Sequence, residues 1–390
     1  METFIQEIKN QDIGHRQVSD ATAKTYSENL GKLHKLVTES DVYPDDHLWL
    51  KDYDKVIEIL DDQDYAASTY RNYLAVISVV LQPKERGTYR DTFEATAKKY
   101  ISLLAIKKAD ATELAEQQKL SSTDKEKWVT TKELIKVRQG YAKELRLAKF
   151  NLGKTGVKGV APKKYIEILQ MYLVSSLYTM DFSNRNVYGK MKIITGDEYR
   201  NMTNFNSVFT HLQHNYLVID KKGKKQIKFF SMGDTKTSWK KVAGKPKEWN
   251  GLVKIDIHKD LNKVINLWLK YKPYGEWLLI GKNGGKPMGR NGLSKFISKT
   301  FKATGKKVGS NIIRKVKNTE EFANDSSIKH KQEVAKKSGH SVATQQLHYT
   351  KHIMDSDDSD SQYGTIGFPA NSLNDCPFCG YSGCNCGSGY

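Results

Sequence analysis

The chain has 390 residues and a mass of 44.4 kDa, which exceeds one ordinary domain and favours two globular domains. Its formal charge of +19, from 63 Lys and Arg against 44 Asp and Glu, favours a polyanionic partner. Charge alone does not separate DNA, RNA and anionic lipid, and nucleic acid is the expected partner.

Two classes of protein are disfavoured by the sequence. No stretch approaches the roughly 18 apolar residues of a membrane span, and the amino terminus lacks a basic and then apolar signal pattern. All four cysteines lie between positions 376 and 386, so no disulfide is expected in the main body. We therefore expect a soluble, intracellular protein with no membrane partner.

The first domain is expected to be all-helical. Apolar residues at helical spacing predict helices over 18–37, 52–60, from 67 or 68 up to Pro83, and 92–106. In the first of these helices the stripe is formed by Tyr26, Leu30, Leu33 and Val37. The boundaries that follow are a domain over 1–106 and a polar connector over 107–127.

The second domain, expected over 128–354, mixes helices with a small sheet. The predicted elements are helices over 131–150 and 163–178, strands over 216–220, 226–231 and 253–257, and helices over 261–271, 292–304, 311–316 and 329–337. Lys221–Lys224 reads as a hairpin turn. The fold class is thus mainly α with a small antiparallel β-sheet. Residues 355–390 form an acidic and then Gly/Ser-rich tail, expected to be disordered outside its cysteines.

The most informative motif sets Gly339-His340 nine positions before Tyr349. This spacing suggests a nucleophilic tyrosine. A phenol with a pKa near ~10 attacks poorly at neutral pH, so positive charge is needed around the group it attacks. Arg185 lies in a polar turn after an apolar helix, and Arg314 lies near a predicted helix start with Ile312 and Ile313 packing behind it.

The order arginine, hairpin lysine, arginine, Gly-His and tyrosine resembles the catalytic domain of the tyrosine recombinase family, over roughly residues 15–352. The run from Leu177-Tyr178-Thr179 to Arg185-Asn186-Val187-Tyr188-Gly189-Lys190-Met191-Lys192-Ile193 is similar to the variant of large DNA viruses, virophages and related mobile elements. The resemblance implies a helical, SAM-like core-binding domain followed by a mixed α/β catalytic domain.

The resemblance also implies roles for single residues. Arg185 and Arg314 would clamp a scissile phosphate, and Tyr349 would attack it to give a 3′-phosphotyrosyl bond and a free 5′-hydroxyl. His340 would hydrogen-bond the phosphate, and Lys236 would protonate the leaving 5′ oxygen. The neighbouring Lys240, Lys241 and Lys245 leave open that this hairpin only contacts phosphates. No metal, ATP or other cofactor is implied for the chemistry.

One position departs from the family pattern. The family usually has histidine three residues before the second arginine, where this chain has Asn311. An asparagine amide donates hydrogen bonds but does not exchange a proton near neutral pH. Proton removal from Tyr349 would then be slower or fall to solvent or another group.

The implied function is a site-specific DNA recombinase or integrase, acting as a homo-tetramer on paired sites in double-stranded DNA. Two alternatives stay open, namely a type IB-like topoisomerase and a catalytically impaired DNA-binding relative. The separate helical unit and the 35-residue interval from Arg314 to Tyr349 favour the recombinase. The location would be the nucleus or a viral replication site for an element that infects eukaryotes, and otherwise the cytoplasm.

Three further groups of residues have competing interpretations. In the core-binding domain, phosphate contacts are assigned to Lys24, Lys32 and Arg71, against a solvated helix face. In the tail, Cys376, Cys379, Cys384 and Cys386 match a structural zinc site, against reduced thiols in a disordered segment. Ala148–Thr155 matches a permissive phosphate-loop pattern, but a helical, charged segment precedes it where a strand is required, so ATP binding is not expected.

Overall fold

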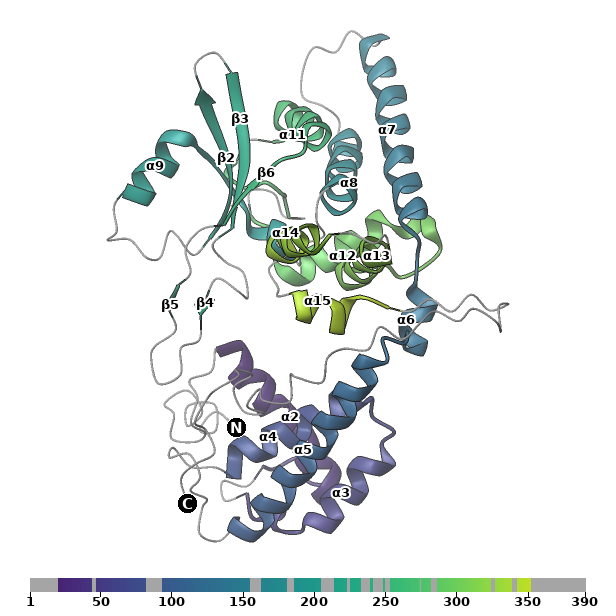
Figure 1. Ribbon diagram of the computed structural model, residues 1–390, viewed down its shortest axis with the longest axis vertical. Coiled ribbons are helices and arrows are strands. Elements are labelled where there is room, and N and C mark those ends of the chain that lie inside the picture. Colours follow the sequence, from purple (N-terminus) through teal and green to yellow (C-terminus); the bar gives the residue numbers. More distant parts are fainter. Residues whose placement is uncertain are drawn as a thin grey trace. The chain divides into compact units, whose positions relative to one another are not determined.

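The computed structural model describes residues 20–43, 47–81, 93–154, 163–180, 186–204, 214–222, 225–232, 239–240, 248–249, 253–273, 275–281, 286–323, 327–338 and 342–351. It is mainly helical with one small four-stranded sheet (Figure 1). The chain divides into two compact units, Met1–Gln117 (unit 1) and Gln118–Tyr390 (unit 2). No helix in the described ranges is long and apolar enough to cross a membrane.

Unit 1 is a helical bundle, as predicted. Its elements are α2 (Asp20–Thr38), the short 3₁₀ helix η1 (Leu48–Lys51), α3 (Tyr53–Asp62), α4 (Ala67–Leu81) and α5 (Glu94–Glu116). The predicted stripe of α2 packs into the core, where Leu30, Leu33 and Val37 are buried. The Asp52 side chain caps α3 by accepting a hydrogen bond from the backbone N–H of Lys55 at 3.3 Å.

The segment predicted as a connector is largely helical. Helix α5 continues ten residues past Ile106 to Glu116, and α6 (Ser122–Lys127) follows. Ala, Lys, Glu and Leu all have high helix propensity, so a polar segment that buries little can still extend a helix begun on the core. The division between the units, after Gln117, falls inside the predicted connector.

The sheet of unit 2 is mixed rather than purely antiparallel. Its order is β1 (Lys192–Thr195), β2 (Asn215–Lys222), β3 (Lys225–Met232) and β6 (Val253–Asp256). β2 and β3 form the predicted hairpin, with Lys222 opposite Lys225, and β6 extends it. β1, which was not predicted, pairs parallel to β2 because α9 (Gly196–Asn204) lies between them and lets the chain return in the same direction. β4 (Trp239–Lys240) and β5 (Glu248–Trp249) pair separately.

Helices cover both faces of this sheet. Along β2 successive side chains alternate, so Leu217 faces the main core while Tyr216 and Val218 pack with Tyr199 and Met202 of α9. Figure 1 shows α9 on one side of the strands and α8 (Lys163–Thr179) and α11 (Lys259–Tyr271) on the other. The sheet is therefore the middle layer of this part of unit 2.

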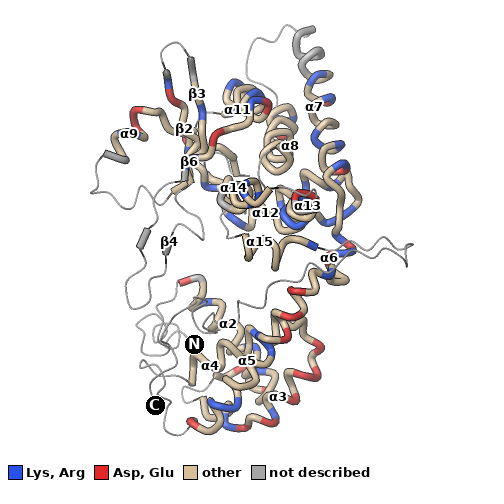
Figure 2. Tube along the Cα trace, in the orientation of Figure 1, with Lys and Arg blue, Asp and Glu red and all other residues tan. Residues whose placement is uncertain are grey.

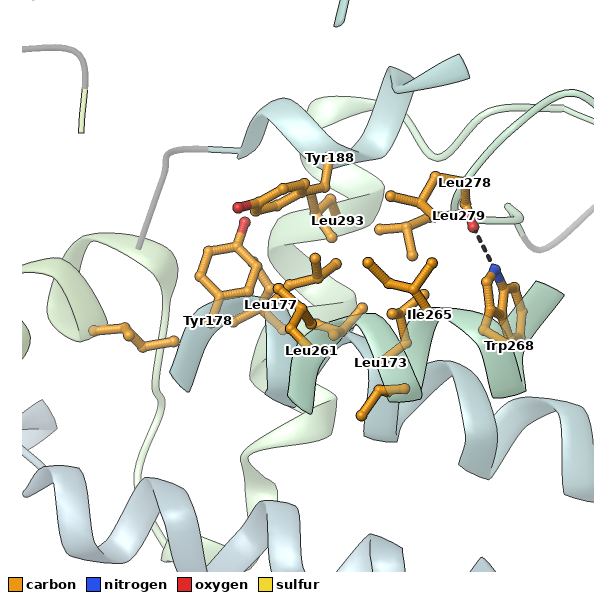
Figure 3. Close-up of a cluster of buried hydrophobic side chains, with 14 of the residues drawn as sticks. Leu173, Leu177, Tyr178, Tyr188, Leu261, Ile265, Trp268, Leu278, Leu279 and Leu293 are labelled. Carbon is orange, nitrogen blue, oxygen red and sulfur yellow. Dashed lines mark hydrogen bonds between the residues drawn. The ribbon is translucent and has the colours of Figure 1, made fainter. Parts of the chain in front are cut away.

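The main core of unit 2 gathers around α8. Figure 3 shows Leu173 and Leu177 of α8 against Leu261 and Ile265 of α11. Trp268 closes one end of the cluster, where its indole Nε1–H donates to the carbonyl of Leu278 at 2.8 Å.

The remaining described helices of unit 2 surround this core. They are α7 (Thr131–Lys154), the 3₁₀ helix η3 (Asn186–Lys190), α12 (Arg290–Thr300), the 3₁₀ helix η4 (Lys302–Thr304), α13 (Ser310–Ala323), α14 (Ile328–Ser338) and α15 (Val342–Tyr349). Helix α7 runs through Ala148–Lys154, so no strand precedes the phosphate-loop-like pattern, in agreement with the prediction. Helix α15 was not predicted.

The two units carry opposite net charge. Residues 1–117 hold 15 Lys and Arg against 21 Asp and Glu, a charge of −6, whereas residues 118–390 hold 48 against 23, a charge of +25. In Figure 2 acidic segments recur along α3 and basic ones along α7. The basic character that predicts a polyanionic partner therefore belongs to unit 2.

Candidate functional site

Arg314 lies in the second turn of α13 with its side chain almost wholly removed from solvent. The helix starts after Gly309, whose carbonyl accepts the backbone N–H of Ile313 at 3.1 Å. Ile312 and Ile313 pack into the main core, as the sequence predicts for the two residues before the arginine. Arg314 itself is 1% exposed, so its charge is presented inside the protein rather than to bulk water.

Tyr349 is the last residue of α15, and its ring lies against Arg314. The guanidinium Cζ is 4.6 Å from the ring centroid, and Tyr349 is 7% exposed. A guanidinium at this distance over an aromatic ring makes a cation–π contact. The arginine and tyrosine that the sequence assigned to one site, 35 positions apart, are thus brought into contact.

A second tyrosine lies near the same charge. Tyr178, in the last turn of α8, is fully buried and packs edge-on against Tyr188, with ring centroids 5.7 Å apart (Figure 3). Burial raises the pKa of the Tyr178 phenol, and the positive charge of Arg314 opposes part of that rise. Arg314 therefore lies near phenols from both α8 and α15.

Helix α15 is held by side-chain hydrogen bonds as well as by packing. Gln345 Nε2 donates a hydrogen bond to Asn318 Oδ1 of α13 at 2.7 Å. Gln118 Nε2 donates one to the Gln346 carbonyl at 3.2 Å. Thr319 Oγ1 donates to the Tyr349 carbonyl at 3.4 Å. An eight-residue helix is unstable alone, so these contacts fix where its last residue lies.

The chain leading into the site is strongly basic. Residues 286–319 contain ten Lys and Arg and no Asp or Glu. Next to Arg314, Lys315 pairs with Asp124 of α6 at 2.5 Å. The pKa of Lys351 is lowered by burial and by repulsion from Lys315, while Asp124 opposes the shift. A surface of this kind suits an anion more than a cation.

The described chain reaches both sides of Arg185. Before it, Thr179 Oγ1 at the end of α8 accepts a hydrogen bond from Arg138 of α7 at 2.8 Å. After it, Asn186 Nδ2 donates to Ser294 Oγ of α12 at 2.6 Å. Arg185 itself lies outside the described residues, as do Lys236, His340 and the four cysteines Cys376, Cys379, Cys384 and Cys386.

The other predicted residues that the structure describes are exposed or half-buried. Asn311 is exposed in the first turn of α13. In unit 1, Lys24 and Lys32 are exposed and Arg71 is half-buried, and Lys24 is 4.0 Å from Glu28. Within the described ranges no three His, Cys, Asp or Glu side chains come together as a group that could hold a metal ion.

Asn318 and Gln345 lie one helical turn from Arg314 and Tyr349 and were not predicted from the sequence. Asn318 is four positions after Arg314, and Gln345 is four positions before Tyr349. Residues four apart share one face of a helix, so this spacing was available as a signal. The Gln-Gln segment before Tyr349 lacks the apolar periodicity that predicts a helix, so the four-residue spacing had no predicted helix to act on.

No protein-family model matches this sequence, and no curated protein matches it. A buried cation in contact with a phenol ring, within a cation-rich segment, is suited to hold an oxyanion next to the phenol oxygen.

Proposed function

We propose that this protein cuts and rejoins DNA through a covalent bond between Tyr349 and a DNA phosphate, as a site-specific recombinase or integrase of the tyrosine type. The observation that carries the proposal is the contact between Arg314 and Tyr349, 4.6 Å from Cζ to ring centroid. Two residues selected from sequence order alone are adjacent on separate helices.

The reaction is a balanced exchange of phosphoester bonds. The Tyr349 hydroxyl gives up its proton to solvent or to another group, and its oxygen forms a bond to phosphorus while the bond from phosphorus to the 5′ oxygen breaks. The leaving 5′ oxygen takes up a proton, for which Lys236 is the proposed donor. Arg314, with Arg185, stabilises the charge that gathers on the non-bridging oxygens. Attack by a 5′-hydroxyl reverses the steps, so the proposed mechanism takes no energy from ATP and assigns no step to a metal.

The partition of charge supports unit 2 as the main DNA-binding unit. Its net charge is +25, and the ten cations of residues 286–319 lead directly to the site. Contacts from Lys24, Lys32 and Arg71 in unit 1 stay part of the proposal, but they come from a unit whose net charge is −6. We propose a homo-tetramer on paired sites as the working assembly.

A phosphate must gain access to a guanidinium that is 1% exposed. Since Arg314 lies beneath the Tyr349 ring, a scissile phosphate reaches its N–H donors only after part of the surrounding structure shifts. The Tyr349 ring, at the end of α15, lies over Arg314. The proposal therefore includes a turn of the Tyr349 side chain off the guanidinium when DNA binds, while α15 keeps its register on α13.

Asn311 favours one alternative, a DNA-binding relative with impaired catalysis. It occupies the position where a proton-exchanging histidine is usual, and its amide has no such capacity. On this alternative the site would hold a phosphate without cleaving the strand.

A trapping assay tests the proposal. A nicked duplex loses a short fragment on cleavage, so a covalent protein–DNA adduct accumulates and survives denaturant. Wild-type protein is expected to form the adduct in the presence of a chelator and without ATP, and Tyr349→Phe is expected to form none. Adduct in the phenylalanine variant would refute the nucleophile assignment. Relaxation of supercoiled plasmid without strand exchange would indicate a topoisomerase instead.

A further inference from the structure

The contact between α13 and α15 contains a buried pair of amide side chains. Asn318 is 4% exposed and Gln345 is fully buried, and Gln345 Nε2 donates to Asn318 Oδ1 at 2.7 Å. Asn318 is one helical turn from Arg314, and Gln345 is one turn from Tyr349. The amide pair thus lies beside the contact between the arginine and the tyrosine, on the same two helices.

This pair is not explained by stability. In the described part of the chain, the other polar atoms of the two amides, Asn318 Nδ2 and Gln345 Oε1, are buried and have no hydrogen-bond partner. A buried donor or acceptor that makes no hydrogen bond destabilises the folded state, and apolar side chains of similar volume remove that penalty. Leucine at both positions would therefore suit a purely structural interface at least as well.

A directional hydrogen bond fixes the register of two helices more tightly than apolar packing does. Two apolar helix faces tolerate small slides and rotations, whereas one amide pair at 2.7 Å is satisfied in only one register. The register of α15 decides where Tyr349 lies, because Tyr349 is its last residue and Gln345 is one turn earlier. Thr319, next to Asn318, holds the same end of α15 through the Tyr349 carbonyl.

We infer that Asn318 and Gln345 are positioning residues that set the register of α15 on α13 and so place Tyr349 next to Arg314. The geometric part of this inference concerns only the two helices. Its consequence for catalysis rests on the proposed function, in which Tyr349 is the nucleophile.

The test uses the full chain with Asn318→Leu and Gln345→Leu combined. The thermal midpoint is expected to stay equal or rise, DNA affinity to stay unchanged, and the rate of adduct formation in the trapping assay to fall about 10- to 100-fold, the scale of a small misplacement of a reacting group. The matched control is Leu347→Met, a volume-conserving change on α15 that leaves the amide pair intact, and its rate is expected to match wild type. The exchanged pair Asn318→Gln with Gln345→Asn keeps two amides and is expected to recover part of the rate.

A second readout does not depend on activity. Fluorotyrosine in place of Tyr349 gives a fluorine resonance that reports the ring environment, expected as one narrow line in wild type and Leu347→Met and as a shifted or broadened line in the double leucine variant. If wild type forms no adduct, the proposed function fails and the fluorine signal alone decides the positioning. If wild type forms adduct and the double leucine variant matches it within about twofold, or if rate and thermal midpoint fall together and the exchanged pair restores neither, the positioning role is overturned while the proposed function stands.

Discussion

At the scale of single residues, Arg314 places a buried positive charge against the ring of Tyr349. Its pairing with Tyr349 was predicted, and the two side chains are in contact. The burial of Arg314 was not predicted, because in a chain with 63 Lys and Arg each arginine is expected at the surface. Burial depends on how α13 and α15 pack together, and this tertiary contact has no local signal in the sequence.

Asn311 provides the sharpest prediction at this scale. If the missing proton acceptor limits the reaction, Asn311→His is expected to raise the rate of adduct formation by about 10-fold or more. The rate should then show a new limb near the ordinary histidine pKa of about 6.5, with activity rising as the imidazole becomes neutral. Single-turnover rates across pH measure this effect. An unchanged rate and pH profile would mean that another group takes the proton.

At the scale of elements, the predicted helices are those with a clear apolar stripe. Helices α2, α4, α8 and α11 were found because one face of each is buried in a core. Among the elements that were missed, β1, α9 and α15 are short and depend on neighbours. In α15 the buried residues are Gln345 and Tyr349, so its inward face is partly polar and does not register as a hydrophobic stripe.

Gly189 in η3 tests a close approach between elements. A Cβ added there would lie 2.2 Å from the carbonyl oxygen of Met288, so Gly189→Ala must displace backbone. We expect a loss of about 1–3 kcal/mol in the free energy of unfolding. Gly140→Ala is the matched control, since a Cβ there meets nothing within 4 Å and alanine favours the helix by about 0.5–1 kcal/mol. Denaturant unfolding of both variants measures the difference, and equal stability would contradict the packing around η3.

The two units each contain a buried tyrosine that predicts alkaline instability. Burial raises the pKa of Tyr73 in unit 1 and of Tyr216 in unit 2 to about 12. Between the unfolded value of about 10 and this raised value, the folded state binds more protons than the unfolded state, so stability falls as pH rises above about 10. The thermal midpoint should decline in that range, and less steeply in the Tyr73→Phe variant. A midpoint that stays level from pH 10 to 12 would contradict the burial of these phenols.

At the scale of the whole molecule, composition predicted a polyanionic partner but not where it binds. The net charge of +19 conceals an acidic unit 1 and a basic unit 2. The division of charge follows the boundary between the two units. That boundary lies after the helix through residues 107–116, which belongs to unit 1. Length alone favours two units and two compact units are present, whereas the distribution of charge between them was not predicted.

The division of charge predicts an unequal salt dependence of DNA binding. Exposed Lys302 and Lys307 lie in the basic segment of unit 2, and Lys24 and Lys32 are exposed on α2 of unit 1. Changing the first pair to Gln is expected to reduce the slope of log affinity against log salt by about 2, and changing the second pair by clearly less. Titrations at several salt concentrations give both slopes. A larger effect from the unit 1 pair would place the main phosphate contacts there.

The central claim is that the Tyr349 oxygen becomes bonded to DNA phosphorus. The most direct measurement digests the adduct from the trapping assay, formed with a pool of nicked duplexes of varied sequence, and locates the nucleotide by mass spectrometry of the peptides. The account predicts a 3′-phosphate nucleotide on the peptide that contains Tyr349, and no adduct from Tyr349→Phe. A nucleotide on any other residue, or wild-type protein that forms no adduct with any duplex, would contradict it.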